Sequence, residues 1–68
     1  LSFVWDAVRS LPVPFREVIH LFYYEGYSTA EISRMLDRKE STVRSDLRRG
    51  RLKLKEILKE ACDFEEIV

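Results

Sequence analysis

Residues 27–51, which read YSTAEISRMLDRKESTVRSDLRRGR, decide the fold of this chain. Ser28 and Glu31 have the S-x-x-E spacing of a capping box, in which each side chain bonds the backbone N–H of the other residue. A short helix is therefore predicted to begin here. Residues 37–39 are predicted to form a tight connection to the next helix. That helix is predicted to be long and amphipathic, over about residues 40–62. Two helices joined by a three-residue turn form a helix-turn-helix.

Two further helices are predicted ahead of this motif. Residues 2–10 carry apolar side chains along one helical face, and Pro14 suits the first turn of a second helix, where its missing N–H costs nothing. Gly26 can take the left-handed conformation that ends this second helix. We therefore predict an all-α fold of four helices, with residues 1–68 as a single domain. Because the chain begins at Leu1 and not at a methionine, we expect it to be a fragment of a longer chain.

Size and composition exclude several classes of protein. A chain of 68 residues is near the lower limit for a domain that folds without disulfides or metals. The only cysteine, Cys62, cannot form an internal disulfide and lacks companions for zinc or thiol chemistry. With no nucleophile–base pair, metal cluster or phosphate loop in the sequence, we expect no enzymatic activity and no cofactor. No apolar run approaches the roughly 20 residues that cross a bilayer, so we expect a soluble, cytoplasmic domain without membrane contact.

The charges are sorted along the chain, although the formal net charge is zero. Residues 38–59 contain nine basic and three acidic residues, a net charge of +6, whereas residues 1–37 and 60–68 are both acidic. A neutral chain with one concentrated basic segment is typical of a protein with one side that faces a polyanion.

The long fourth helix has two stripes of helical period. Val43, Leu47 and Leu54 belong to an apolar stripe, and Gly50 lies in the same row, which indicates that another backbone passes close to it. The second stripe is basic and advances in steps of four, three, four and four residues: Arg44, Arg48, Arg51, Lys55 and Lys59. We therefore expect one face of this helix to pack on the core and the other to be cationic.

These features favour DNA binding over a merely solvated basic face. The major groove of B-DNA, about 12 Å wide, admits one helix, and that recognition helix needs polar side chains on its N-terminal turns to reach the base edges. The fourth helix opens with hydroxyls and arginines of this kind. The residues expected to contact DNA are Ser28, Thr29, Arg38, Lys39, Ser41, Thr42, Arg44, Ser45, Arg48, Arg49 and Arg51.

Several linked motifs resemble domain 4 of bacterial sigma factors, especially those of the extracytoplasmic-function group. They are the L-P of residues 11–12, R-E-V-I of 16–19, Y-E-G-Y-S of 24–28, E-I of 31–32 and T-V-R-S-D-L-R-R-G-R of 42–51. The resemblance implies a domain that reads the minus-35 promoter element in the major groove and docks on the flap of the β subunit of RNA polymerase. In many members an anti-sigma protein also holds the sigma factor inactive.

Three residues depart from the pattern of this family. Asp37 stands where the family usually has glycine in the turn, but aspartate tolerates left-handed backbone, so we expect the turn to survive. Lys39 replaces a Ser or Thr cap, so we expect the start of the recognition helix to fray without DNA. Asp46 stands where many members have a basic residue, and we expect its carboxylate to repel phosphate.

The aromatic and terminal apolar residues indicate a protein partner. So small a core has no room for all of Phe22, Tyr23, Tyr24 and Tyr27, so we predict that Phe22 is in the core and that some of the tyrosines contact a partner. The residues expected at this surface are Tyr23, Tyr24, Phe64, Ile67 and Val68. His20, with no Cys or His nearby, is expected at the surface or core edge and not in a metal site.

Two alternative functions remain open on the sequence alone. The output domain of LuxR-type regulators shares the R-E-V, E-I and T-V pattern, although Thr29-Ala30 and the single long basic helix point away from it. A helical protein-interaction domain bound by an anti-sigma protein is the other alternative. The salt dependence of binding to duplex DNA distinguishes this last function from DNA binding, because each neutralised phosphate adds about 0.9 to the log–log slope.

Overall fold

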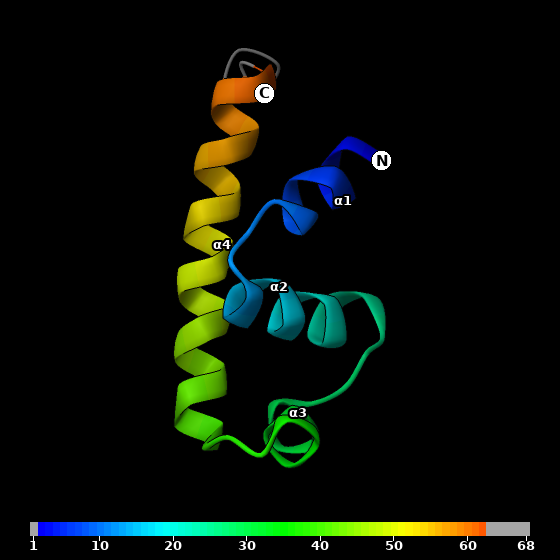
Figure 1. The fold of residues 1–68 in the computed structure, drawn as a ribbon, viewed down its shortest axis with the longest axis vertical. Coiled ribbons are helices and arrows are strands. Elements are labelled where there is room, and N and C mark those ends of the chain that lie inside the picture. The colour runs from blue at the N-terminus through cyan, green and yellow to red at the C-terminus, as the bar shows by residue number, and fades with distance from the viewer. Residues whose placement is uncertain (1, 63–68) are drawn as a thin grey trace.

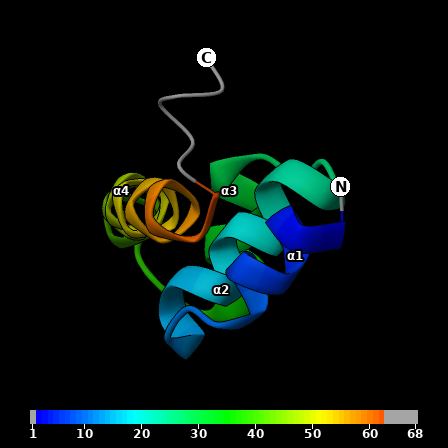
Figure 2. The same cartoon turned by 90° about the horizontal axis from the view of Figure 1, so that it is seen from above.

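The computed structural model describes residues 2–62. They form several short helices that pack along the side of one long helix. In chain order these are α1 (Ser2–Arg9), α2 (Val13–Ile19), the π-helical segment η1 (His20–Tyr24), α3 (Thr29–Leu36) and α4 (Glu40–Cys62). Figure 1 shows α4 upright, with α1, α2 and α3 arranged one below another beside it. Seen from above in Figure 2, the three shorter helices all lie to one side of α4. The predicted all-α fold with a long fourth helix is confirmed.

Proline and glycine set the limits of α2 and η1. Pro12 precedes α2 with extended backbone and Pro14 lies in its first turn, where no N–H is needed. The chain then continues without a break into η1, where the Glu25 N–H bonds the His20 carbonyl five residues back, at 3.1 Å. Gly26 follows with a φ of 85°, the left-handed conformation predicted for it.

The connection between α3 and α4 is built from local bonds. The predicted capping box is present, with the Glu31 N–H donating to the Ser28 hydroxyl at 3.1 Å and the Ser28 N–H donating to the Glu31 carboxylate at 2.8 Å. Asp37 ends α3 in the left-handed region with a φ of 55°. The Arg38 N–H bonds the Ser33 carbonyl at 3.0 Å, and the Ser33 hydroxyl donates back to the Arg38 carbonyl. The turn therefore survives the replacement of glycine by Asp37, as predicted.

The core lies where α2, α3 and α4 meet. Its fully buried centre is Val18 of α2, Ile32 of α3 and Val43 of α4, all with no exposed surface. Leu47, one turn beyond Val43, extends the same cluster and is 3% exposed. The apolar stripe predicted for α4 therefore faces the core. Its opposite side is left to solvent.

Gly50 lies where α4 crosses α2. A Cβ atom at this position would come within 2.7 Å of the Ile19 Cδ1 atom and 3.2 Å of the Phe15 Cβ atom. The expectation of close approach is right, but the neighbours are side chains of α2 and not a backbone. Packing of two side chains against a helical backbone needs a residue without its own side chain, which explains glycine within a helix.

The second half of α4 is less buried than the first. Leu54 and Ile57 are partly buried against the core cluster, whereas Leu52 is exposed. Among the described residues, no helix is long and apolar enough to cross a membrane.

Candidate nucleic-acid interface

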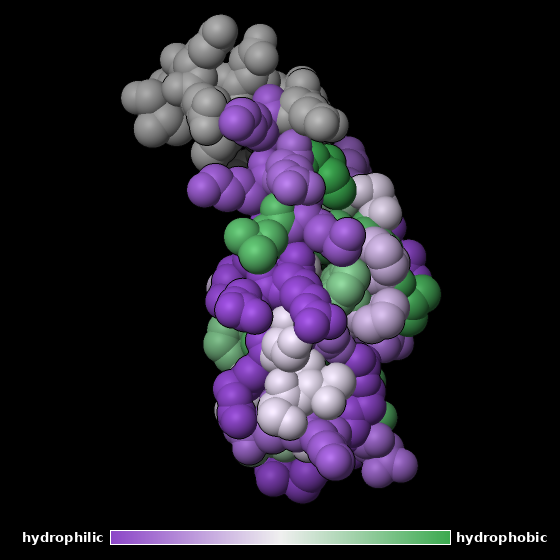
Figure 3. All heavy atoms as spheres, turned by 90° about the vertical axis from the view of Figure 1, so that its left-hand side faces the viewer, coloured by the Kyte–Doolittle hydropathy of each residue, from purple (hydrophilic) through white to green (hydrophobic). Residues whose placement is uncertain are grey.

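The outward side of α4 is the basic surface of the molecule. Figure 3 shows this side as mostly hydrophilic, with separate hydrophobic groups among the hydrophilic ones and a pale band of weakly polar atoms in its lower part. Arg44, Arg48 and Arg51 are all exposed, while Val43 and Leu47, the residues just before Arg44 and Arg48, are buried. The two stripes predicted from the sequence therefore lie on opposite sides of one helix.

The first three turns of α4 present hydroxyls and guanidinium groups to solvent. Ser41 and Thr42 are exposed and Ser45 is half-buried, so small polar side chains lie at the N-terminal end of this surface. Arg48 and Arg49 are exposed, and in residues 2–62 neither makes a side-chain hydrogen bond or ion pair. Their donors are therefore available to an incoming anion. Lys39, in the turn, is exposed as well.

Glu40 is an acidic residue within this basic surface, and its position in the sequence alone predicts no role for it. Its Oε2 atom accepts a hydrogen bond of 2.7 Å from the Thr29 hydroxyl at the start of α3. The same oxygen pairs with the Arg44 Nη1 atom at 3.1 Å. The four-residue spacing of Glu40 and Arg44 could have indicated this pair, but the bond to Thr29 depends on the packing of α3 against α4.

Asp46 does not face the solvent side of α4. The residue is 7% exposed, and its carboxylate forms an ion pair with Arg38 in the turn. The expectation that Asp46 repels phosphate is therefore wrong in its premise, because the charge points inward and is neutralised. Arg38, which we expected at the DNA, has a side chain that is 27% exposed and is directed to Asp46.

Two other predicted contact residues are already engaged within the chain. The Ser28 hydroxyl caps α3, and Arg51 donates through Nη1 to the Tyr23 hydroxyl at 2.9 Å. Tyr23 was predicted at the partner surface and Arg51 at the DNA, so this bond joins the two predicted surfaces. It connects η1 to the middle of α4.

Glu31 is the described residue whose surroundings shift its pKa most clearly. Its pKa lies below the ordinary value of 4.5, first because the Ser28 backbone N–H donates to it and second because the Ser28 side chain favours the charged form, with Arg34 nearby as a minor cause. The charged form of Glu31 is therefore part of the folded helix start.

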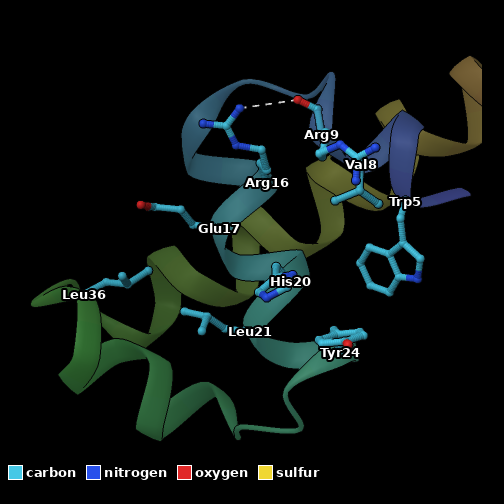
Figure 4. A pocket seen from close by; sticks show the side chains of 9 residues that line it. All are labelled: Trp5, Val8, Arg9, Arg16, Glu17, His20, Leu21, Tyr24 and Leu36. Atoms are coloured by element: carbon cyan, nitrogen blue, oxygen red, sulfur yellow. Dashed lines mark hydrogen bonds between the residues drawn. The ribbon is translucent and has the colours of Figure 1, made fainter. Parts of the chain in front are cut away.

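A groove lies on the other side of the molecule, between α1, α2, η1 and α3. Its volume is about 680 Å³, and apolar residues including Trp5, Val8, Leu21 and Leu36 line it. Figure 4 shows Trp5 and Tyr24 at one end and Leu36 at the other. Charged groups, Arg9, Arg16 and Glu17, also line this groove.

Three rings form the aromatic end of the groove. The Tyr24 ring stacks on His20 with centroids 5.1 Å apart, and it meets Trp5 edge-on at 5.3 Å. The His20 Nε2 atom lies 3.3 Å from the Glu25 carboxylate. Tyr24 is nevertheless 64% exposed, which leaves most of its surface available to a partner. The predicted surface position of His20 is confirmed, while the predicted contacts Phe64, Ile67 and Val68 lie outside the described residues.

Within residues 2–62, no group of three or more His, Cys, Asp or Glu side chains has the arrangement of a metal site. The described residues therefore provide two surfaces. One is the outward side of α4, with cationic and hydroxyl donors, and the other is the apolar groove between α1, α2, η1 and α3.

Comparison with known proteins agrees with this arrangement. A family described as Sigma-70, region 4, matches residues 4–54, which include α1 from Val4 on, α2, η1, α3 and more than half of α4. The chain is also 36% identical over 60 residues to the RNA polymerase sigma factor SigZ of Bacillus subtilis (strain 168). That alignment covers 88% of this chain and 34% of the relative, so the chain spans about a third of the length of the protein it matches. Both matches favour the sigma factor interpretation over the LuxR-type alternative.

Proposed function

Because the chain belongs to the sigma-70 region 4 family, the non-enzymatic part of a sigma factor that binds the minus-35 promoter element, we propose that α4 is its recognition helix. In this proposal the first three turns of α4 enter the major groove of promoter DNA. The protein thereby selects the sites at which RNA polymerase begins transcription.

One observation carries the proposal. Arg48 and Arg49 are exposed and unengaged within the described residues, while Val43 and Leu47 in the two preceding turns of α4 are buried in the core. The core contact holds α4 at a fixed position on α2 and α3, so the arginines approach DNA on a rigid element. Rigid placement favours sequence-dependent contacts over loose electrostatic association.

The candidate contacts divide by chemistry. Ser41, Thr42 and Ser45 have short side chains, so they reach DNA only if the helix lies deep in the groove. Arginine can form two parallel bonds to the O6 and N7 atoms of guanine, whereas any cation can bind phosphate. We assign base contacts to Arg44 and Arg48, and phosphate contacts to Lys39 and Arg49.

Four predicted contacts are revised in this proposal. Arg38 acts through its ion pair with Asp46, and Ser28 through its cap, so neither is assigned a direct DNA contact. In the absence of DNA, Thr29 donates a hydrogen bond to Glu40 and Arg51 donates one to Tyr23, so DNA would have to displace these partners to contact either residue.

A protein partner is the second part of the proposal. RNA polymerase follows from the family, and we propose that its β flap docks in the groove that Trp5, Leu21 and Tyr24 line. An anti-sigma protein that covers the same groove would keep the sigma factor from polymerase. Since bacterial transcription takes place in the cytoplasm, the proposal locates the protein there.

A titration of promoter duplexes with the 68-residue chain tests the DNA part. We expect Arg48→Ala to weaken binding by about 1–3 kcal/mol and to relax the preference at one base pair. Arg9→Ala is the matched control, because Arg9 is an exposed arginine on α1 that lines the groove and is not part of the basic stripe of α4. Equal binding by the two variants would contradict the assignment of α4.

A further inference from the structure

Glu40, Thr29 and Arg44 form a connected group at the point where α3 and α4 begin. Thr29 is the first residue of α3 and Glu40 is the first residue of α4. The Glu40 Oε2 atom accepts from the Thr29 hydroxyl at 2.7 Å and pairs with Arg44 Nη1 at 3.1 Å. One carboxylate oxygen thus connects the capped helix of the motif to a guanidinium on the recognition helix.

This arrangement differs from an ordinary surface ion pair. Pairs of exposed side chains four residues apart are weak because both side chains must give up rotational freedom to meet. Here Thr29, whose β-branched side chain is stiff, holds the carboxylate from another helix. Arg44 therefore pairs with a carboxylate that is held in place. Its guanidinium is planar, so a contact at Nη1 also sets the direction of the donors that remain.

The negative charge of Glu40 is expected to weaken the affinity for DNA, although its contact with Arg44 favours recognition. A carboxylate on a surface that approaches phosphates repels DNA of every sequence. A residue that only strengthened DNA binding would not be acidic at this position. The expected contribution of Glu40 is therefore to the choice between sequences, and its removal should change affinity and discrimination in different directions.

We propose that Glu40 is a positioning residue for DNA recognition: held by the Thr29 hydroxyl, it fixes the Arg44 guanidinium in the orientation that reads a guanine edge. This inference rests on the proposed function, since it gives Arg44 a base to read. It adds Glu40, which carries no donor for DNA, to the residues that determine specificity.

Binding titrations of duplexes that differ at one base pair test the proposal. The relevant pair is the one at which Arg44→Ala loses its preference. We expect Glu40→Gln to lower discrimination at this pair by about fivefold or more, while binding to unrelated duplexes is unchanged or tighter. In the Arg44→Ala background, Glu40→Gln should have no further effect on discrimination. A uniform change for all duplexes, with discrimination intact, would show that Glu40 acts only through its charge and would overturn the proposal.

Thr29 offers a matched pair of variants. Thr29→Val removes the hydroxyl with little change of shape, whereas Thr29→Ser keeps the donor. We expect the valine variant to lose discrimination as Glu40→Gln does, and the serine variant to behave like the wild type. Equal discrimination by the valine and serine variants would overturn the role of the hydroxyl.

A measurement without DNA separates this inference from the proposed function. The NMR signals of the Arg44 guanidinium should shift and exchange faster in Glu40→Gln and Thr29→Val, but not in Thr29→Ser. Unchanged signals in the first two variants would overturn the inference while leaving DNA recognition by α4 intact. If the signals respond but the wild-type chain binds every duplex equally, the proposed function fails, and the inference fails with it.

Discussion

At the scale of single residues, the acidic side chains of the helix-turn-helix are as informative as the basic ones. Asp46 is buried and paired with Arg38, so it joins the turn to the second turn of α4. Glu40 joins α3 to the first turn. These two carboxylates hold α4 against the rest of the motif, and the exposed arginines keep the DNA contacts that we propose for them.

We expect Asp46→Ala to lower the free energy of unfolding by about 1–3 kcal/mol, because it leaves the half-buried Arg38 guanidinium without its partner. Chemical denaturation gives this value. Asp6→Ala is the matched control, since the Asp6–Arg9 pair is exposed and should contribute about 0.5 kcal/mol or less. A larger loss for Asp6→Ala than for Asp46→Ala would contradict the structural role of the inner pair.

Residue roles could be predicted from the sequence only where they follow from helical period. Exposure of Arg44 and Arg48 opposite Val43 and Leu47 follows from spacing alone, and it is what the structure has. The partners of Asp46 and Thr29 lie eight and eleven residues away, on other elements. Those bonds depend on the angle at which helices cross, which spacing along the chain does not determine.

At the scale of elements, helix starts and ends were predictable because their signals are local. The capping box of Ser28 and Glu31 and the left-handed backbone at Gly26 and Asp37 each depend on a few adjacent residues. The π-helical geometry of η1 was not predicted. Its residues have no glycine or proline to mark a change, and a bond five residues back has no spacing signal of its own in the sequence.

The capping box makes the stability of α3 dependent on pH. Because folding lowers the Glu31 pKa below 4.5, the charged carboxylate stabilises the folded state above that pH, and this contribution is lost as the pH falls through the lowered value. Glu31→Gln keeps an acceptor for the Ser28 N–H but cannot titrate. We expect the melting temperatures of wild type and Glu31→Gln to differ at pH 7 and to converge toward pH 3. A constant difference over this range would contradict the pKa assignment.

The attachment of α4 to the core depends on its buried stripe. Leu47→Ala should lower the free energy of unfolding by about 2–5 kcal/mol, because it removes a side chain that is 3% exposed from a small core. Leu52→Ala makes the same change on the same helix at a position that is 59% exposed, and should change stability by about 0.5 kcal/mol or less. Thermal melts followed by circular dichroism compare the two. The opposite ranking would mean that the stripes of α4 are reversed.

At the scale of the whole molecule, α4 separates two surfaces with different chemistry. The basic side of α4 carries the proposed DNA contacts, and the apolar groove between α1, η1 and α3 carries the proposed polymerase contact. The bond between Arg51 and Tyr23 runs between them. The sequence indicated both surfaces by charge sorting and by surplus aromatic residues. It did not indicate that Trp5, His20 and Tyr24 form one end of a groove, because α1 is distant in the sequence.

We expect Tyr24→Ala to weaken binding of a β flap fragment by about 2 kcal/mol, since an exposed tyrosine at the end of an apolar groove is a typical anchor. Its affinity for DNA should not change. Tyr27→Ala is the matched control, because Tyr27 is also exposed but does not line the groove. Titration calorimetry measures both variants. Wild-type flap affinity in Tyr24→Ala would place the polymerase surface elsewhere.

The central claim is that this chain recognises duplex DNA by sequence through the exposed face of α4. Selection of bound duplexes from a random pool, at a stated salt concentration, tests it most directly. We predict enrichment of one short motif by the wild-type chain, and loss of that enrichment in Arg44→Ala and Arg48→Ala. Affinity for the motif should fall with salt by about 0.9 logarithmic units per neutralised phosphate and decade of salt. A pool that stays random, or one enriched equally by the wild type and both variants, would contradict the account.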